Sequence, residues 1–331
     1  MIKILYAASN NYYSSLQLIR IINSIKELPV IIKVAAYKKS SPKNISIDWT
    51  LDSLLNINKP ELLSIDNDNF IIYYDQIKNF NPDLIISDLE YFTSHIANLL
   101  NKPLWQCSST LINIALTKSQ KYDLGIFKKY AIYLNKTPVN VQKIINIIDN
   151  SNKNFIYSHF GDTMKPLEIK QNFQWLRPYY KLGKNNLLCK HNIVAALPDS
   201  NKFIINSLSK YQDSIIFTNN HNEKYNNILN KDINNDIEYS CNLHNSNIFV
   251  CEGQTTFLSD AFYNKKTSVI YPNYLSPESL INKTLSDYLK LSYDDINFDY
   301  PDLSLNLDSK IKFLHEEILF FIKENENDIK S

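Results

Sequence analysis

The stretch "VCEGQTTFLSDAF", residues 250–262, contains one of only four glycines in 331 residues, although glycine usually makes up about 7% of a chain. The apolar run 248–251 predicts a strand and residues 255–263 predict a helix, so Gly253 lies in the turn between them. A helix that begins there points free N–H groups and the positive end of its dipole outward, and a residue without Cβ lets a phosphate approach the main chain. The stretch therefore predicts a diphosphate-binding turn. The simpler alternative is an ordinary strand-to-helix turn with Thr255 or Thr256 as N-cap.

Asp88 is the second candidate for chemistry, because it directly follows the strand-like run 83–87. Open α/β sheets place functional groups at the carboxyl ends of their strands. An isolated carboxylate there can act as a general base when burial raises its pKa. The alternative is that Asp88 only caps the following helix.

The elements that position these residues alternate along the chain. Short runs rich in Ile and Val recur between stretches of helical period, which is typical of a parallel sheet in an α/β fold. The expected strands are residues 2–8, 30–36, 83–87, 104–107 and 155–158 in the first half and 193–197, 214–217, 237–240, 248–251 and 268–271 in the second. This order predicts two doubly wound, Rossmann-like domains that face a cleft.

Three segments follow from that division. Residues 1–168 are expected to form the first domain and 169–310 the second, with a linker within 164–186 that contains two prolines and a glycine. Residues 311–331 carry apolar side chains at helical spacing, so this last helix must bury its apolar face against another part of the protein. We expect it to pack back on the first domain.

Composition limits the function classes. The formal net charge is +1 and the pI is about 7.6, so no overall field would attract nucleic acid or an anionic membrane. The N-terminus lacks the pattern of a signal peptide, and no apolar run reaches the roughly 18 residues of a membrane span. We therefore expect a cytoplasmic protein without stable membrane insertion. The four cysteines lack CxxC spacing, and neither a DxD-like motif nor a His/Asp cluster indicates a metal.

Several further motifs follow one another in the second half: "GQTT" at 253–256, the acid Asp260, a strand closed by Pro272, and "ESLIN" at 278–282. Taken together they resemble the GT-B glycosyltransferases, the superfamily of the UDP-glycosyltransferases and the lipid II N-acetylglucosaminyltransferase. In the first half, "NPDLIISDLEYFTSHIANLLNKPLWQCSS", residues 81–109, looks like the acceptor-side part of that superfamily. The likeness covers nearly the whole chain, although each motif alone is loose.

The resemblance implies a site for a nucleotide-diphosphate sugar, most simply a UDP-sugar, with no other cofactor and no metal. Gly253, Gln254 and Thr255 would hold the diphosphate, with the hydroxyl of Thr256 in support. Asp260 would bind the donor ribose, although it stands one residue later than in many members. The pair Glu278 and Ser279 would grip the sugar hydroxyls, and His221, after a strand of the second domain, could contact the donor base or phosphates.

On the acceptor side, many inverting members take their catalytic His from the first strand-to-helix turn, where this chain has Tyr12, Tyr13 and Ser14. A tyrosine with a pKa of about 10 is a poor base at neutral pH. Asp88 is then the base itself, a histidine from elsewhere (His95 or His159) reaches the cleft, or base catalysis is lost.

The leading hypothesis is an inverting, metal-independent glycosyltransferase whose acceptor is a small molecule, a glycan or, less simply, modified DNA. The alternatives are a non-catalytic nucleotide-sugar binder and a nucleotide-sugar epimerase of the same fold.

Overall fold

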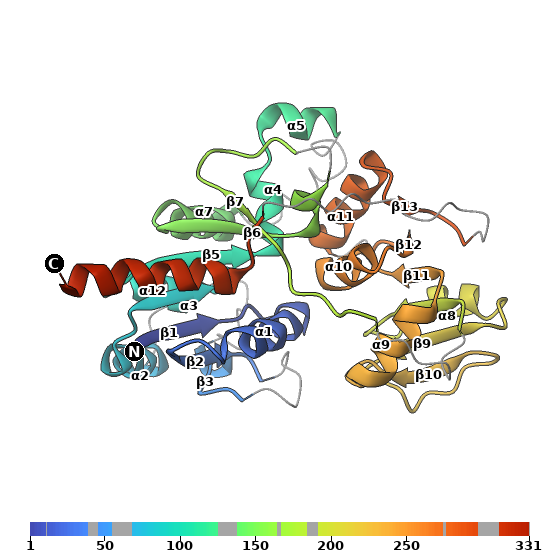
Figure 1. Cartoon of the computed structure of the whole chain (residues 1–331), viewed down its shortest axis with the longest axis horizontal. Helices are drawn as coiled ribbons and strands as arrows, with labels where there is room; N and C mark the ends of the chain where they lie inside the picture. Colours follow the sequence, from blue (N-terminus) through green and yellow to red (C-terminus); the bar gives the residue numbers. More distant parts are fainter. Residues whose placement is uncertain are drawn as a thin grey trace.

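The computed structural model describes residues 1–10, 12–38, 46–54, 68–124, 138–163, 167–183, 191–273, 276–296 and 311–330. These residues form two α/β domains (Figure 1). No helix among them has the length and apolarity needed to cross a membrane.

The first domain is built on a seven-stranded parallel sheet in the order β3-β2-β1-β4-β5-β6-β7. Its strands are β1 Ile2–Ala7, β2 Val30–Ala36, β3 Trp49–Thr50, β4 Leu84–Ser87, β5 Leu104–Ser108, β6 Lys153–Tyr157 and β7 Gln174–Leu176. Its helices are α1 Tyr12–Ile25, α2 Asp68–Phe80, α3 Tyr91–Leu99, α4 Ile112–Ala115, α5 Lys118–Asp123 and α7 Pro138–Asp149, with 3-10 turns at Asp52–Leu54, Ser109–Leu111 and His159–Asp162. The central strands are buried on both faces, which explains their unbroken apolar runs.

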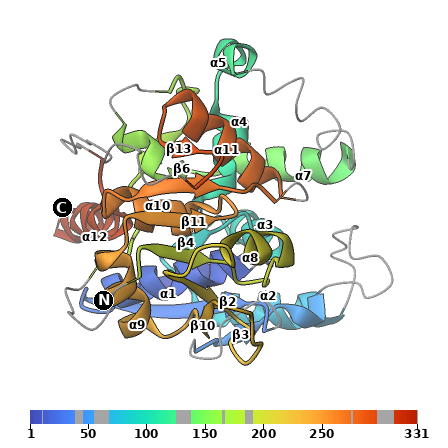
Figure 2. The same cartoon turned by 90° about the vertical axis from the view of Figure 1, so that its right-hand side faces the viewer.

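The second domain repeats this plan with a six-stranded parallel sheet in the order β10-β9-β8-β11-β12-β13. In Figure 2 this domain faces the viewer. Its strands are β8 Ile193–Ala196, β9 Ser214–Thr218, β10 Leu229–Asp232, β11 Ile248–Cys251, β12 Thr267–Ile270 and β13 Ser292–Tyr293. Its helices are α8 Lys202–Leu208, α9 Asp236–Asn245, α10 Thr255–Tyr263 and α11 Pro277–Tyr288. The predicted architecture of two doubly wound α/β domains is confirmed.

One predicted strand is wrong, because residues 237–240 lie in α9. The helix starts where the Asn235 side chain accepts a hydrogen bond from the backbone N–H of Glu238. Asp236 and Glu238 in the first turn complement the helix dipole. Tyr239 and Leu243 are buried at helical spacing, whereas the run "IEYS" alone fits either period.

The boundary between the domains differs from the expected one. Strand β7 belongs to the first sheet, so that sheet extends beyond residue 168 and takes up part of the expected linker. Helix α12, Leu314–Lys330, lies along the first domain (Figure 1). Its Leu314, Ile318 and Ile322 are buried in the core that also contains the side chains of β1 and α1.

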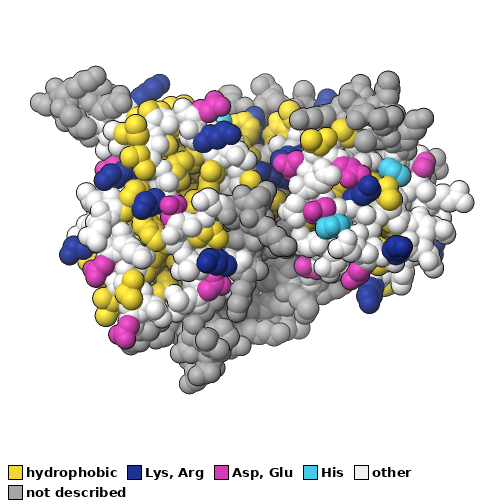
Figure 3. Space-filling model, turned by 90° about the horizontal axis from the view of Figure 1, so that it is seen from below, with side chains coloured by type: hydrophobic (Ala, Val, Ile, Leu, Met, Phe, Trp, Pro, Cys, Tyr) yellow, Lys and Arg dark blue, Asp and Glu magenta, His cyan; other side chains and the backbone are white. Residues whose placement is uncertain are grey.

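Charged side chains of both signs intermingle on the face shown in Figure 3, without a continuous stripe of one sign among the residues described there. This distribution agrees with the near-zero net charge and offers no basic track for a nucleic acid on that face.

Candidate functional site

A small cavity lies between the two domains, at the carboxyl ends of the first-domain strands and the beginning of α10. Its volume is about 20 Å³, enough for about one water molecule. It is lined by Tyr6, Gln17, Ile21, Asp88, Cys107, Ser108, Ser109 and Tyr157 from the first domain and by Thr255, Thr256 and Glu278 from the second. Four of the residues singled out by sequence thus meet in one place, although they come from both halves of the chain.

Asp88 extends from the end of β4 and is 8% exposed. Its backbone N–H donates to the carbonyl oxygen of Ala7 (2.9 Å), and the hydroxyl of Ser9 donates to its Oδ2 (3.4 Å). The alternative role as helix cap does not hold, because Glu90 is the N-cap of α3 and accepts from two backbone N–H groups of that helix. The Asp88 carboxylate therefore belongs to the cavity.

Gly253 has φ +91°, a left-handed conformation that favours glycine. A Cβ built on it would lie 2.9 Å from the carbonyl oxygen of Ser279 and 3.2 Å from Cγ2 of Ile270. The space that the missing Cβ leaves is therefore filled by the first turn of α11. Glycine is required here by the backbone angle and by this packing, and a phosphate contact of the turn stays a prediction.

The N-terminus of α10 is occupied by a carboxylate from another helix. Gln254 is the N-cap residue, in place of the expected Thr255 or Thr256, and its side chain makes no cap hydrogen bond. Instead, Oε1 of Glu278 accepts from the backbone N–H of Thr255 (3.2 Å) and from the hydroxyl of Ser109 (2.9 Å). Glu278 thus bridges the two domains with its negative charge at the positive end of the α10 dipole.

The hydroxyl of Thr256 also faces the first domain, where it donates to Oε1 of Gln17 (3.3 Å). Thr255 and Thr256 are 3% and 4% exposed. The two threonines of the predicted diphosphate turn therefore lie at the domain interface.

Asp260, for which the resemblance implied a ribose contact, lies at the domain interface, and that contact stays a prediction. Its carboxylate is fully buried and forms two hydrogen bonds of 2.8 Å with the guanidinium of Arg20, from α1. It also accepts from the backbone N–H of Lys181 (2.7 Å) and from the hydroxyl of Tyr239 (3.1 Å). With both oxygens engaged by four donors, Asp260 is an anchor between the domains.

Ser279, the second member of the predicted sugar-binding pair, is held by hydrogen bonds within the second domain, and its sugar contact stays a prediction. It is fully buried, its hydroxyl donates to the carbonyl oxygen of Glu252, and the same hydroxyl accepts from the N–H of Asn273 (2.8 Å). These bonds fix the first turn of α11 against the end of β11, which leaves Glu278 as the member of the pair that reaches the cavity.

Neither alternative histidine lines the cavity. His159 is buried between Phe160 and Phe262, at ring distances of 4.2 and 4.9 Å, and burial lowers its pKa to about 3. His95 lies on the outer side of α3, stacked on Tyr91 at 6.0 Å, and burial lowers its pKa as well.

His221 is exposed in the loop after β9, with its Nδ1 3.9 Å from Oδ2 of Asp232. Its contact with a donor stays a prediction. Tyr12, Tyr13 and Ser14 form the first turn of α1, but their side chains lie outside the described part of the chain, and their acceptor role also stays a prediction.

Sequence reasoning missed the first-domain partners of the site. Ser108 is the last residue of β5, the strand next to β4, and Ser109 follows it, so the rule that placed Asp88 could have indicated them too. No local sequence pattern indicated Gln17 or Arg20 as site residues, because their partners Thr256 and Asp260 lie 239 and 240 residues away.

Burial also shifts the pKa values of two groups in and beside the site. It raises the pKa of Cys107, and the nearby Asp88 adds to that effect. Burial raises the pKa of Glu252, the acid that precedes Gly253 and accepts from Asn201 at 2.7 Å. Both groups are thereby shifted toward their neutral forms. No cluster of three or more His, Cys, Asp or Glu side chains that could hold a metal is present in the described ranges.

Comparisons with solved structures identify the arrangement of the domains. S. aureus MnaA with UDP matches 100% of this chain and 98% of its own at a TM-score of 0.58 and 11% identity. The spinosyn forosaminyltransferase SpnP matches over 90% and 87% of the two chains (TM-score 0.56, 13% identity). The chain has the GT-B fold. A protein described as a UDP-N-acetylglucosamine 2-epimerase from Listeria monocytogenes aligns over 99% and 97% of the chains (TM-score 0.55, 11% identity). No protein-family model and no curated protein matches the sequence.

Proposed function

We propose that this protein is an inverting glycosyltransferase that takes a sugar from a nucleotide-diphosphate sugar, with UDP as the first nucleotide to test. The observation that carries the proposal is the meeting of Asp88, Thr255, Thr256 and Glu278 in one interdomain cavity. A carboxylate thus faces a helix N-terminus across the cleft, as transfer to a hydroxyl requires.

In the proposed reaction, Asp88 takes the proton of the acceptor hydroxyl while the acceptor oxygen attacks the anomeric carbon. The bond from that carbon to the diphosphate breaks on the opposite side, and the nucleoside diphosphate leaves with the electron pair. The N–H groups and hydroxyls of Thr255 and Thr256 stabilise the charge that develops on the leaving group. No bound metal is invoked for this step.

The cavity of about 20 Å³ is far below the roughly 300–1,000 Å³ of ordinary ligand pockets. Donor entry therefore requires the domains to separate and Glu278 to leave the N-terminus of α10, where the diphosphate takes its place. The freed Glu278 carboxylate could then accept hydrogen bonds from the sugar hydroxyls, as the resemblance implies. Closure around both substrates would exclude water.

The test is calorimetric titration with UDP, TDP and their sugar conjugates, followed by NMR time courses of each nucleotide sugar. Wild type should bind at least one nucleotide and its sugar conjugate and should slowly cleave the conjugate to the free nucleotide. Asp88→Asn should bind equally but lose this turnover by 100-fold or more. Asp75→Asn, an exposed change on α2, is the matched control and should behave as wild type.

Two alternatives give distinct results in the same experiment. Epimerisation changes the sugar signals without net transfer, and it is worth testing because two of the compared structures, UDP-bound MnaA and the protein described as an epimerase, align over nearly the whole chain. A non-catalytic binder gives binding without any change in the spectra. Absence of binding by every nucleotide would overturn the donor site itself.

A further inference from the structure

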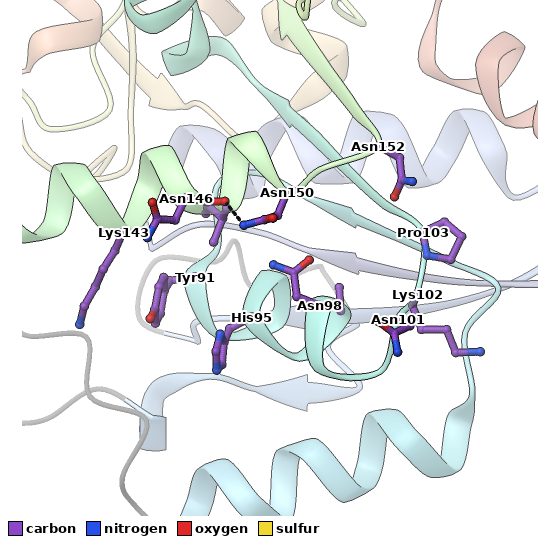
Figure 4. Close-up of a pocket in the computed structure, with 12 residues that line it drawn as sticks. Tyr91, His95, Asn98, Asn101, Lys102, Pro103, Lys143, Asn146, Asn150 and Asn152 are labelled. Carbon is purple, nitrogen blue, oxygen red and sulfur yellow. Dashed lines mark hydrogen bonds between the residues drawn. The ribbon is translucent and has the colours of Figure 1, made fainter.

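A second and much larger cavity lies in the first domain, in a groove between α3 and α7 with a volume of about 710 Å³ (Figure 4). It continues past Asn101 and Pro103, before β5, to Asn152, before β6. These positions precede their strands, whereas Asp88 follows its strand, so the groove extends away from the interdomain cleft. The two cavities share no lining residue.

Amide side chains dominate the groove. Five of its twelve lining residues are asparagine, compared with 43 of 331 in the whole chain. These are Asn98, Asn101, Asn146, Asn150 and Asn152. An amide presents donors and an acceptor together, so a row of them suits a ligand whose hydroxyl groups also do both.

Two of these amides are already held in place. The Asn150 amide donates to the carbonyl oxygen of Asn146 (2.8 Å), and the Asn152 side-chain oxygen accepts from the N–H of Leu104 (2.8 Å). Figure 4 shows Asn98, from α3, pointing toward Asn150, from α7. Part of the polar lining is therefore fixed before any ligand arrives, which lowers the entropy cost of binding.

One end of the groove is aromatic. The rings of Tyr91 and His95 are parallel within 6° at 6.0 Å, and Phe70 lies 6.1 Å from the His95 ring. Together they form an aromatic cluster at this end of the groove, beside which the apolar C–H groups of a sugar can pack while its hydroxyls reach the amides.

The charged groups of the groove are all basic among its described lining residues. Lys143 places its Nζ 5.4 Å from the Tyr91 ring centre, and Lys102 lies at the far end, where its Nζ contacts the side-chain oxygen of Asn81 at 2.6 Å. Two separated lysines suit a ligand with a few negative groups. They are too few for the continuous basic track that single-stranded nucleic acid uses.

We propose that the groove between α3 and α7 binds an anionic oligosaccharide, with a sugar ring against Tyr91 and His95, hydroxyls on the asparagines, and a sulfate, phosphate or carboxylate near Lys143. The site is independent of the transfer reaction, because no residue of the interdomain cavity takes part in it.

The test is titration of the full chain with a heparin-derived hexasaccharide, followed by chemical-shift mapping and calorimetry. Maltohexaose serves as the neutral probe and a six-nucleotide oligo-dT as the nucleic-acid probe. The sulfated hexasaccharide should bind at least fivefold more tightly than either. The double variant Asn98→Ala/Lys143→Ala should weaken that binding by at least tenfold.

The matched control is Lys202→Ala/Asn206→Ala, which removes the same side-chain types from the exposed face of α8 and should leave the affinity unchanged. Lys143→Gln, which removes the charge but keeps a polar side chain, should reproduce most of the loss if the double variant fails to fold. Asp88→Asn should bind the hexasaccharide as wild type does, which separates this proposal from the glycosyltransferase proposal.

Four results would overturn the proposal. The first two are equal weakening of hexasaccharide binding by both double variants and equal affinity for the neutral probe. The other two are tighter binding of oligo-dT and absence of saccharide binding at millimolar concentration.

Discussion

The turns after β4 and β11 occupy equivalent places in the two domains. Each strand pairs with the first strand of its sheet, and each is followed, after three residues, by a helix of nine residues. The three residues also correspond, since an acid is followed by a residue with positive φ and then by the N-cap. In the first domain they are Asp88, Leu89 (φ 53°) and Glu90, and in the second Glu252, Gly253 (φ 91°) and Gln254.

The two turns differ in the group that caps the N-terminus of the following helix. Glu90 accepts from the N–H groups of Phe92 (3.1 Å) and Thr93 (2.7 Å), so α3 is capped from within its own turn. Gln254 makes no such bond, and the N–H of Thr255 is bound by Glu278, from α11. A helix capped from within offers no place for an anion, whereas one capped by another helix can exchange that carboxylate for a ligand. The comparison explains why the donor site is proposed at α10 although both domains have the same plan.

The largest expected difference concerns the residues with positive φ. Gly253→Ala should lower the free energy of unfolding by about 2–4 kcal/mol, from left-handed strain and overpacking together. The new Cβ would lie 2.9 Å from the Ser279 carbonyl oxygen. Leu89→Ala adds no atom at the equivalent position and should cost about 1 kcal/mol. Urea denaturation of both variants measures this, and similar losses would contradict the packing argument.

Lowering the pH should destabilise the contact between His159 and Phe262 of α10 more than the packing of α3. Burial lowers the pKa of His159 to about 3, from an ordinary value of 6.5, so its contribution to stability is present above pH 6.5 and is lost as the pH falls toward 3. Between pH 7 and pH 5 the loss should reach about 2 kcal/mol. His159→Phe should remove this part of the pH dependence, because phenylalanine stays neutral between Phe160 and Phe262.

His95→Phe is the control on α3, where the histidine is only half-buried and the same change should leave the pH dependence of unfolding nearly intact. Urea denaturation at pH 7, 6 and 5 separates the two variants. Equal slopes in wild type and His159→Phe would show that His159 is not the acid-sensitive group.

Sequence reasoning succeeded where local pattern fixes the structure. Apolar runs marked the parallel strands, and the turn before residue 255 gave the start of α10. The rule of carboxyl strand ends then placed Asp88 in the same cavity as Thr255 and Thr256. The segment 237–240 failed because four residues cannot distinguish a period of 2 from one of 3.6, and the decisive signal was the cap at Asn235.

Asp260 and Ser279 make contacts that no local pattern reveals. Asp260 stands where a ribose ligand would, but its partner Arg20 lies 240 positions earlier. Ser279 follows an acid as a sugar-binding pair would, yet its hydroxyl bonds the carbonyl oxygen of Glu252. In both cases the side-chain type was compatible with binding, and a contact with a residue distant in sequence occupies it in this structure: across the domain interface for Asp260 and within the second domain for Ser279.

The exchange of Glu278 for a ligand can be tested through affinity. Glu278→Gln removes the negative charge that competes with a diphosphate at the N-terminus of α10, so UDP should bind up to about tenfold more tightly. Glu324→Gln, an exposed change on α12, should leave the affinity unchanged. Calorimetric titration decides, and weaker UDP binding by Glu278→Gln would mean that this carboxylate assists the nucleotide instead of competing with it.

The smallest expected effect lies at the other ends of the same two helices. After α3 the residue with positive φ is Asn101 (51°), and after α10 it is Lys265 (56°). After both helices, the backbone N–H of the residue that follows donates to a carbonyl oxygen five residues earlier. These hydrogen bonds run from Lys102 to Ala97 and from Lys266 to Ala261, each at 2.9 Å, which is the Schellman arrangement.

Asparagine tolerates this conformation better than lysine does, so Lys265→Gly should raise the free energy of unfolding by about 0.5 kcal/mol and Asn101→Gly by less. Lys265→Ala keeps the strain while it removes the exposed side chain, and it should not stabilise the protein. Urea denaturation of the three variants gives the ranking. A gain from Lys265→Ala equal to that from Lys265→Gly would assign the effect to the side chain rather than to the backbone.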